Sequence, residues 1–424
     1  MTSRTGRAAV IGARRRGRGL ARMPGALVAA GALTCGGCAA SAATPPSTTT
    51  TRAPTTTSTA PPTTIATTTT ARPRPTTTTI RPATTTTTAP SPATGPIVDV
   101  GITYYTWVNP VGTAVDYATG GNMARTLLTE IRYPTLAGSP GGETVNAPPD
   151  RRRTPYPVIV FAHGYAVTPD LYEPMLDAWV EAGYVVVSPL FPDENGDEVN
   201  ALGGPYSNAG FQAQDDLPNE PYDLAYIVSR VVRWSAAPRL AEPTGAAVLS
   251  GLVDPRRLVL AGQSDGATAV AGLAFDSVYA ATYKAMPVHP ALVAAMSGQE
   301  YLHSPNSYAG YAGAPALLVV QSTSDECNLP QLSTQLYDAI GTTKLFLRIV
   351  GATHIAPYTG VEPFADQVTS QTLALFPAAF AGPSSLASSV DAAGDDLTDG
   401  QSAPPIAPLY PTAAEAAKAC SANP

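Results

Sequence analysis

The first 98 residues of this 424-residue chain contain no acidic side chain, and the first 103 contain no aromatic one. A folded domain of that length needs large apolar side chains for its core, so this composition excludes a globular domain at the start of the chain. The whole chain has only four cysteines and four histidines. Because there are so few histidines, each can be weighed individually as a candidate base or metal ligand.

Residues 1–38 are predicted to be a signal peptide. Seven arginines within residues 1 to 22 precede a short apolar run, PGALVAAGALT, which is too short to span a bilayer as a helix. The following LTCGGCAAS resembles the lipobox of bacterial lipoproteins, in which a lipidated cysteine becomes the mature N-terminus. We favour Cys38 over Cys35, because two glycines precede Cys38. The alternative is cleavage without lipidation, which releases a soluble protein. The sequence is compatible with export by either the general or the twin-arginine pathway.

Residues 39–96 are predicted to be a disordered linker. Nearly every residue from 41 to 95 is Thr, Pro, Ala or Ser, and the only charges are four arginines. Burial of so little apolar surface cannot offset the entropy cost of ordering the chain, and the prolines keep it extended. We therefore expect a semi-rigid stalk between the export signal and a folded domain.

The remainder of the chain is strongly acidic. Residues 1 to 95 hold 11 of the 25 basic residues, which leaves 14 against all 32 acidic residues, a formal charge of −18. This charge argues against binding to nucleic acid or to anionic lipid. We expect a monomer on the outer face of the cell membrane or in the medium, with membrane contact only through the N-terminal lipid.

Residues 97–381 are predicted to form one α/β domain. Continuous apolar runs are typical of central parallel strands covered on both faces, and they occur at residues 157–162, 184–189, 257–262, 316–321 and 345–350, with a weaker run at 291–298. Residues 125–135 alternate like a half-exposed strand. Apolar residues at helical spacing, as in residues 171–179 and 224–232, predict helices packed on the sheet.

Two segments of this body are irregular. Residues 191–221 are long, polar and interrupted by Gly and Pro, and we expect them to form a rim or lid over a site. Their acidic residues could bind calcium, but the spacing is not that of an EF-hand. Residues 382–424 are predicted to be a tail packed on the domain. We expect Cys420 in this tail to form a disulfide with Cys327, since an exported chain keeps disulfides and offers no other partner within the folded part.

The segment LVLAGQSDGATAV contains the pattern G-x-S-x-G, with Ser264 between Gly262 and Gly266. A predicted strand precedes it and a run of small residues suited to a helix follows it, which is the context that a nucleophilic serine on a strained turn requires. A serine needs a base, usually a histidine held by a carboxylate.

His354 is the best candidate for the base, because it directly follows an apolar strand. The other histidines, His163, His289 and His303, are interpreted as structural. Asp325 follows the strand between Ser264 and His354 and is favoured over Glu326 as the carboxylate. The order Ser, Asp, His is that of α/β-hydrolases.

An acyl-transfer site also needs N–H donors for the oxyanion. We assign the backbone N–H groups of Asp265, the residue after the nucleophile, and of Tyr165 in FAHGYAV, which follows an earlier strand. The Asp265 carboxylate is unusual at this position. A helix cap or a structural hydrogen bond is its favoured role, and binding of a cationic group is the alternative.

The segments FAHGYA, DPRRLVLAGQSDGA, VQSTSDECN and GATHIAP together resemble the α/β-hydrolase superfamily over residues 120 to 380. Within it they resemble the secreted bacterial esterases and lipases that include polyester hydrolase-like and dienelactone-hydrolase-like groups. The chain departs from cutinase-type polyester hydrolases, which have His, Met and a second Gly around the serine where this chain has Gln263, Asp265 and Ala267. Dienelactone hydrolases proper use a cysteine nucleophile.

The resemblance implies an α/β-hydrolase fold with a mostly parallel sheet and helices on both faces, and hydrolysis of carboxylic esters without cofactor or metal. Ser264, Asp325 and His354 would form the catalytic triad. A serine peptidase or amidase on the same fold is one alternative. A cell-surface binding protein that retains the fold without turnover is the other.

Overall fold

The computed structural model describes residues 99–136, 142–241, 243–299, 308, 313–393 and 397–398. The predicted signal peptide with Cys38, the stalk, His303 and Cys420 lie outside the described residues, so the expectations about them stay predictions. Within the described part of the chain, no helix is both long enough and apolar enough to cross a membrane.

Ten strands of the described residues form one sheet: β1 (Asp99–Asp116), β2 (Gly121–Thr135), β3 (Glu143–Val145), β4 (Tyr156–Ala162), β5 (Val185–Pro189), β6 (Val253–Gln263), β7 (Leu292–Met296), β8 (Ala316–Ser322), β9 (Lys344–Ile349) and β10 (Leu397–Thr398). Their order across the sheet is β10-β9-β8-β7-β6-β4-β5-β2-β1-β3. The six central strands from β9 to β5 run parallel, whereas β2 is antiparallel to both of its neighbours.

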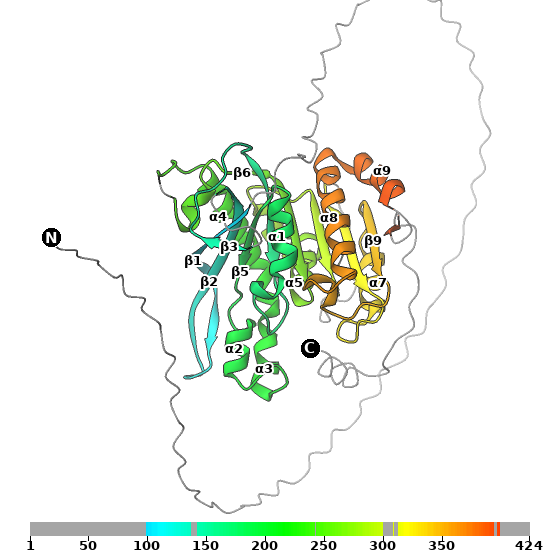
Figure 1. Ribbon diagram of the computed structural model, residues 1–424. Helices are drawn as coiled ribbons and strands as arrows, with labels where there is room; N and C mark the ends of the chain where they lie inside the picture. The colour runs from blue at the N-terminus through cyan, green and yellow to red at the C-terminus, as the bar shows by residue number, and fades with distance from the viewer. Residues whose placement is uncertain are drawn as a thin grey trace, which may run out of the picture. The chain divides into compact units, whose positions relative to one another are not determined.

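Helices cover both faces of this sheet. The described residues form α1 (Glu173–Glu181), α2 (Gly196–Ala201), α3 (Asn208–Ala213), α4 (Glu220–Ser235), α5 (Asp265–Phe275), α6 (Ala280–Ala285), α7 (Pro330–Ala339), α8 (Phe364–Ala381) and α9 (Pro383–Ala393). Side chains of α1 and α8 pack in one hydrophobic cluster, and those of α4, α5 and α7 pack in the other. Figure 1 shows α1 and α8 in front of the strands. The predicted α/β class with a mostly parallel sheet is confirmed.

The continuous apolar runs form the central strands because both of their faces are covered. In β4, Val158 and Val160 join one hydrophobic cluster, while Ile159 and Phe161 join the other, and all four are fully buried. Period-two alternation places successive side chains on opposite faces. The weaker run at 291–298 is also a central strand, β7.

The amino-terminal strand β1 was not predicted. It pairs with β2 in an antiparallel hairpin whose outer half is largely exposed. Strand β2 is exposed from Gly121 to Ala124, alternates between buried and exposed residues from Arg125 to Leu128, and is buried from Thr129 onward. The half-exposed strand predicted over residues 125–135 therefore alternates only over residues 125–128.

Residues 191–221 connect β5 to α4 and contain α2, α3 and the 3₁₀ turn η2 (Gln214–Asn219). Figure 1 shows α2 and α3 beyond the ends of the strands, at the lower end of the domain in this view. The start of the segment is buried from Phe191 to Gly196, so it packs on the domain, whereas Tyr206 and Phe211 near its middle are exposed.

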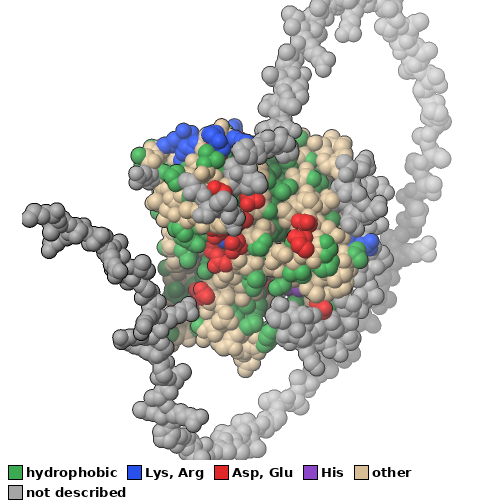
Figure 2. Space-filling model, viewed as in Figure 1, with side chains coloured by type: hydrophobic (Ala, Val, Ile, Leu, Met, Phe, Trp, Pro, Cys, Tyr) green, Lys and Arg blue, Asp and Glu red, His purple; other side chains and the backbone are tan. Residues whose placement is uncertain are grey.

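The amino ends of β4 and β6 hold a cluster of arginines, called here the basic end, which consists of Arg151, Arg152, Arg153, Arg239, Arg256 and Arg257. Arg151 donates to the Ser250 carbonyl at 2.9 Å, and Arg239 donates to the Gly251 carbonyl at 3.1 Å. Figure 2 shows basic side chains gathered at the upper end of the domain in this view.

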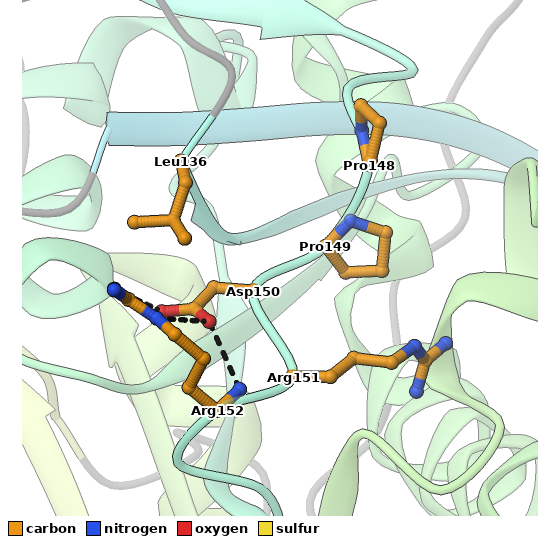
Figure 3. Close-up of a pocket in the computed structure, with 6 residues that line it drawn as sticks. All are labelled: Leu136, Pro148, Pro149, Asp150, Arg151 and Arg152. Carbon is orange, nitrogen blue, oxygen red and sulfur yellow. Dashed lines mark hydrogen bonds and ion pairs between the residues drawn. The ribbon is translucent and has the colours of Figure 1, made fainter.

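A surface pocket of about 480 Å³ lies at the same end, lined by Leu136, Pro148, Pro149, Asp150, Arg151 and Arg152 (Figure 3). Asp150 accepts hydrogen bonds from the backbone and the guanidinium of Arg152. The carboxyl ends of the parallel strands, where Ser264 lies, are at the other end of the sheet, so this pocket is separate from the predicted site.

Candidate active site

Ser264 occupies a strained turn between β6 and α5. Its backbone has φ +57° and ψ −121°, a region that residues other than glycine rarely adopt. A Cβ atom at Gly262 would lie 2.3 Å from the Gly266 carbonyl oxygen, and one at Gly266 would lie 2.3 Å from the Ala162 carbonyl oxygen. Both glycines are therefore required by the close approach of the backbone, as the G-x-S-x-G pattern indicates.

The fold brings Ser264, His354 and Asp325 together at the carboxyl ends of β6, β9 and β8. His354 Nε2 lies 3.0 Å from Ser264 Oγ. His354 Nδ1 lies 2.9 Å from both carboxylate oxygens of Asp325. With Nδ1–H donated to Asp325, Nε2 is left to accept the serine proton, so the three side chains have the geometry of a nucleophile, its base and an orienting carboxylate.

The order of the strands in the sheet, together with the order of Ser264, Asp325 and His354 along the chain, identifies the fold. The serine turn follows a central parallel strand, and the aspartate and then the histidine follow later strands of the same sheet.

The chain has the α/β-hydrolase fold.

No protein-family model matches the sequence, and no curated protein matches it. Among solved structures, the chain is similar to a ferulic acid esterase from Streptomyces cinnamoneus. The two are 17% identical, the alignment covers 77% of this chain and 97% of that chain, and the TM-score is 0.44.

In this α/β-hydrolase fold, Asp325 is held by its own loop. Its Oδ1 accepts the backbone N–H groups of Cys327 and Asn328, each at 2.9 Å, and its Oδ2 accepts from Gln321 Nε2 at 3.0 Å. These donors fix the position of the carboxylate beside His354. The adjacent residue, Glu326, is not the one that contacts the imidazole.

The Asp325 carboxylate also changes the pKa of His354. Burial lowers the pKa of His354, but the Asp325 carboxylate and its hydrogen bond raise it, and the net pKa lies above the ordinary value of 6.5. A fully buried carboxylate therefore lies in hydrogen-bond contact with the imidazole and favours its protonated form.

The described histidines other than His354 bind backbone groups. His163 Nδ1 donates to the Gly164 carbonyl at 2.8 Å, and its Nε2 accepts the Phe191 N–H at 3.0 Å. Burial lowers the pKa of His163 to about 4, so its ring is neutral at neutral pH. His289 Nε2 lies 3.0 Å from the Tyr283 carbonyl oxygen. Both rings therefore hold local backbone structure.

The loop after β4 passes directly beside the nucleophile. A Cβ atom added to Gly164 would lie 3.0 Å from the Ser264 Cβ, so the backbone of the HGY segment is in close contact with the serine. The hydroxyl of Tyr165 in this loop donates to the Pro205 carbonyl oxygen at 3.3 Å. The Tyr165 side chain therefore binds residues 191–221.

Sequence reasoning did not find two residues that contact this site. The Tyr172 hydroxyl accepts the Gly164 N–H at 3.1 Å and donates to Gln263 Oε1 at 2.7 Å. Gln263 Nε2 in turn donates to the His354 carbonyl oxygen at 3.3 Å. This chain of hydrogen bonds joins the loop after β4, the serine turn and the histidine loop. In the sequence, the only signal of these hydrogen bonds is the position of Gln263 directly before Ser264.

The Asp265 side chain forms a structural hydrogen bond, which is the favoured one of the roles considered from sequence. Its Oδ2 accepts from Gln214 Nε2 at 2.6 Å, and the residue is 3% exposed. Burial raises the pKa of Asp265, and the Gln214 hydrogen bond and the nearby His354 oppose this effect.

The site could also be considered as a metal centre, because Asp325, Cys327 and His354 place potential ligand atoms within 4.8 Å of one another. These residues do not fit a metal. Cys327 is disulfide-bonded and offers no thiolate, and both imidazole nitrogens of His354 already have partners. The predicted partner of Cys327, Cys420, lies outside the described residues, so that pairing stays a prediction.

Proposed function

We propose that this protein is an exported serine hydrolase that cleaves carboxylic esters through an acyl-enzyme. The observation that supports this most directly is the hydrogen-bonded series Ser264, His354 and Asp325 with the serine on a strained turn. Secreted bacterial esterases and lipases are the group that its motifs resemble. Anchoring through Cys38 on an extended stalk is part of the proposal and follows from the composition of residues 1–96.

In the first half of the reaction, Ser264 Oγ attacks the ester carbonyl carbon while its proton passes to His354 Nε2. The carbonyl oxygen becomes an oxyanion in the tetrahedral intermediate. His354 then gives the proton to the departing alkoxide, the carbon–oxygen bond breaks, and an alcohol and an acyl-serine remain. In the second half, water attacks the acyl-serine with the same proton transfers, and the carboxylic acid is released. Asp325 keeps the imidazole oriented and stabilises its charged form.

The oxyanion would bind the backbone N–H groups of Asp265 and Tyr165. Asp265 is the first residue of α5, and the N–H groups of a first helical turn have no acceptor within their own helix. Tyr165 follows Gly164, whose backbone contacts the serine. Donors fixed in this way need no reorganisation when charge develops, and each is worth about 10²- to 10³-fold in kcat.

The test is hydrolysis of p-nitrophenyl esters from acetate to palmitate, together with labelling by a fluorophosphonate. We expect the full chain to turn over and to be labelled, and Ser264→Ala to lose both. Ser297→Ala is the matched control, because Ser297 also has a positive φ, +52°, and follows the neighbouring strand β7, but its hydroxyl binds Tyr358. That variant should keep both activities.

A folded wild-type chain that neither hydrolyses the esters nor reacts with the label would overturn the proposal and favour the binding-protein alternative. Parallel assays on p-nitroanilides separate an esterase from an amidase. Faster turnover of the anilides than of the matched esters would replace the ester assignment with the peptidase or amidase one.

A further inference from the structure

Residues 191–221 contact both the loop after β4 and the serine turn. On one side, the Ala166 N–H donates to the Glu194 carbonyl oxygen at 2.8 Å, and the Gly196 N–H donates to the Val167 carbonyl oxygen at 3.0 Å. On the other side, Gln214 in η2 donates to the Asp265 carboxylate at 2.6 Å. The segment therefore contacts the loops of both residues whose N–H groups are assigned to the oxyanion.

The Asp265 carboxylate poses an electrostatic problem at this place. It belongs to the residue whose N–H is to bind an oxyanion, and it is almost completely buried, so water screens it little. A negative charge so close to a developing oxyanion raises the energy of the tetrahedral intermediate. The same charge favours the protonated form of His354, so the balance depends on where the carboxylate is held.

Other titratable groups surround Asp265. Glu194 and Glu220 are fully buried and interact with it electrostatically, as do Tyr165 and Tyr172. Burial raises the pKa values of Glu194 and Glu220 well above the ordinary range. Gln214 is the side chain in hydrogen-bond contact with the Asp265 carboxylate among the described residues.

We propose that Gln214 is a positioning residue for ester hydrolysis. Its amide holds the Asp265 carboxylate against residues 191–221, which directs the charge into this segment and leaves the Asp265 N–H free for the oxyanion. The inference rests on the proposed ester hydrolysis. Under this proposal, residues 191–221 do more than form the predicted rim of the site, because Gln214 within them positions a charged group beside the oxyanion.

The test is a double-mutant cycle of Gln214→Leu and Asp265→Asn, measured as kcat and KM for p-nitrophenyl acetate. Gln214→Leu removes the amide and should lower kcat about tenfold with little change in KM, since the released charge acts mainly on the transition state. Asp265→Asn keeps the side-chain shape and the N–H but removes the charge. In that background, Gln214→Leu should change kcat less than twofold.

Gln212→Leu is the matched control, because Gln212 lies two residues earlier and is exposed. It should leave kcat unchanged. The affinity of a boronic acid, which mimics the tetrahedral intermediate, gives a second measurement and should fall in Gln214→Leu but not in Gln212→Leu.

An equal loss of kcat from Gln214→Leu in both backgrounds would overturn the inference, because it would show that Gln214 acts through packing and not through the charge of Asp265. Unchanged kcat in Gln214→Leu would overturn it too. In either case the wild type would still hydrolyse esters, whereas a wild type without hydrolysis or labelling would remove the proposed function itself. Thermal unfolding of each variant shows whether a loss of kcat follows from loss of folded protein.

Discussion

At the scale of single residues, the proposed ester hydrolysis should depend on pH through His354 and its partner Asp325. His354 can accept the serine proton only when it is neutral, and its pKa is raised above 6.5. We therefore expect kcat/KM for a p-nitrophenyl ester to rise with pH through a midpoint above 6.5.

Asp325→Asn should lower kcat by roughly 10³- to 10⁴-fold, because the amide no longer selects the Nδ1–H tautomer.

Glu326→Gln is the control for this prediction. Glu326 also raises the pKa of His354, but its effect is smaller than that of Asp325. We expect this variant to keep most of its activity, with only a small shift of the pH midpoint. Comparable losses in the two variants would contradict the choice of Asp325 as the orienting carboxylate.

The residues of this site differ in how far sequence could predict them. The proximity of Ser264, Asp325 and His354 could be predicted because each follows an apolar run, and parallel strands bring their carboxyl ends to one edge. Gln214 and Tyr172 could not be found in this way. Their partners lie 51 and 91 residues away along the chain, and only the packing of the loops brings them into contact.

At the scale of elements, the hairpin β1–β2 is joined to residues 191–221 by a buried guanidinium. Arg125 on β2 contacts Asp216 in η2 and Asp223 in α4, each at 2.6 Å, and it is 1% exposed. Asp223 also accepts from Asn109 on β1 at 2.7 Å. This cluster connects the outer strands to the helix that follows the segment.

Arg125→Met should destabilise the domain by about 3–5 kcal/mol, because it leaves two buried carboxylates without their cation. Urea unfolding followed by circular dichroism measures this change. Arg233→Met on the exposed side of α4 is the control and should change the free energy of unfolding by less than about 0.5 kcal/mol. Equal midpoints for Arg125→Met and wild type would show that the cluster adds no stability.

Elements with a continuous apolar pattern were predicted well, and elements whose pattern depends on context were not. The six central strands match their apolar runs to within a few residues. Strand β1 was missed because half of it is exposed and its apolar residues are interrupted. Helix α8 continues through Pro377 and ends at Ala381.

At the scale of the whole molecule, two buried carboxyl groups make stability depend on pH. Glu194 and Glu220 are fully buried in the folded state, and both have pKa values raised well above 4.5. A carboxyl whose pKa is raised by folding binds its proton more tightly in the folded state. The stability it contributes is therefore present below about pH 4.5 and decreases as the pH rises toward the folded pKa.

Glu220→Gln removes one of these ionisations while keeping the side-chain shape. We expect its melting temperature to exceed that of the wild type at pH 8 by more than it does at pH 5. Asp215→Asn, at an exposed position in the same segment, should show no such difference between the two pH values. A constant difference between Glu220→Gln and wild type at both pH values would contradict the assigned ionisation.

The basic end gives the domain an electrical polarity. Six of the 14 basic residues after residue 95 lie there, at the amino ends of the parallel strands, and the triad lies at the carboxyl ends. Near a negatively charged surface, this distribution of charge orients the domain so that its arginines face the surface. The effect acts over the electrostatic screening length, which is roughly 8 Å at physiological salt. Ser264 then faces the opposite direction. An ester dissolved in the medium would then reach Ser264 directly, because the serine would face away from the surface. An ester embedded in that surface would lie next to the arginines, at the end of the domain opposite to Ser264.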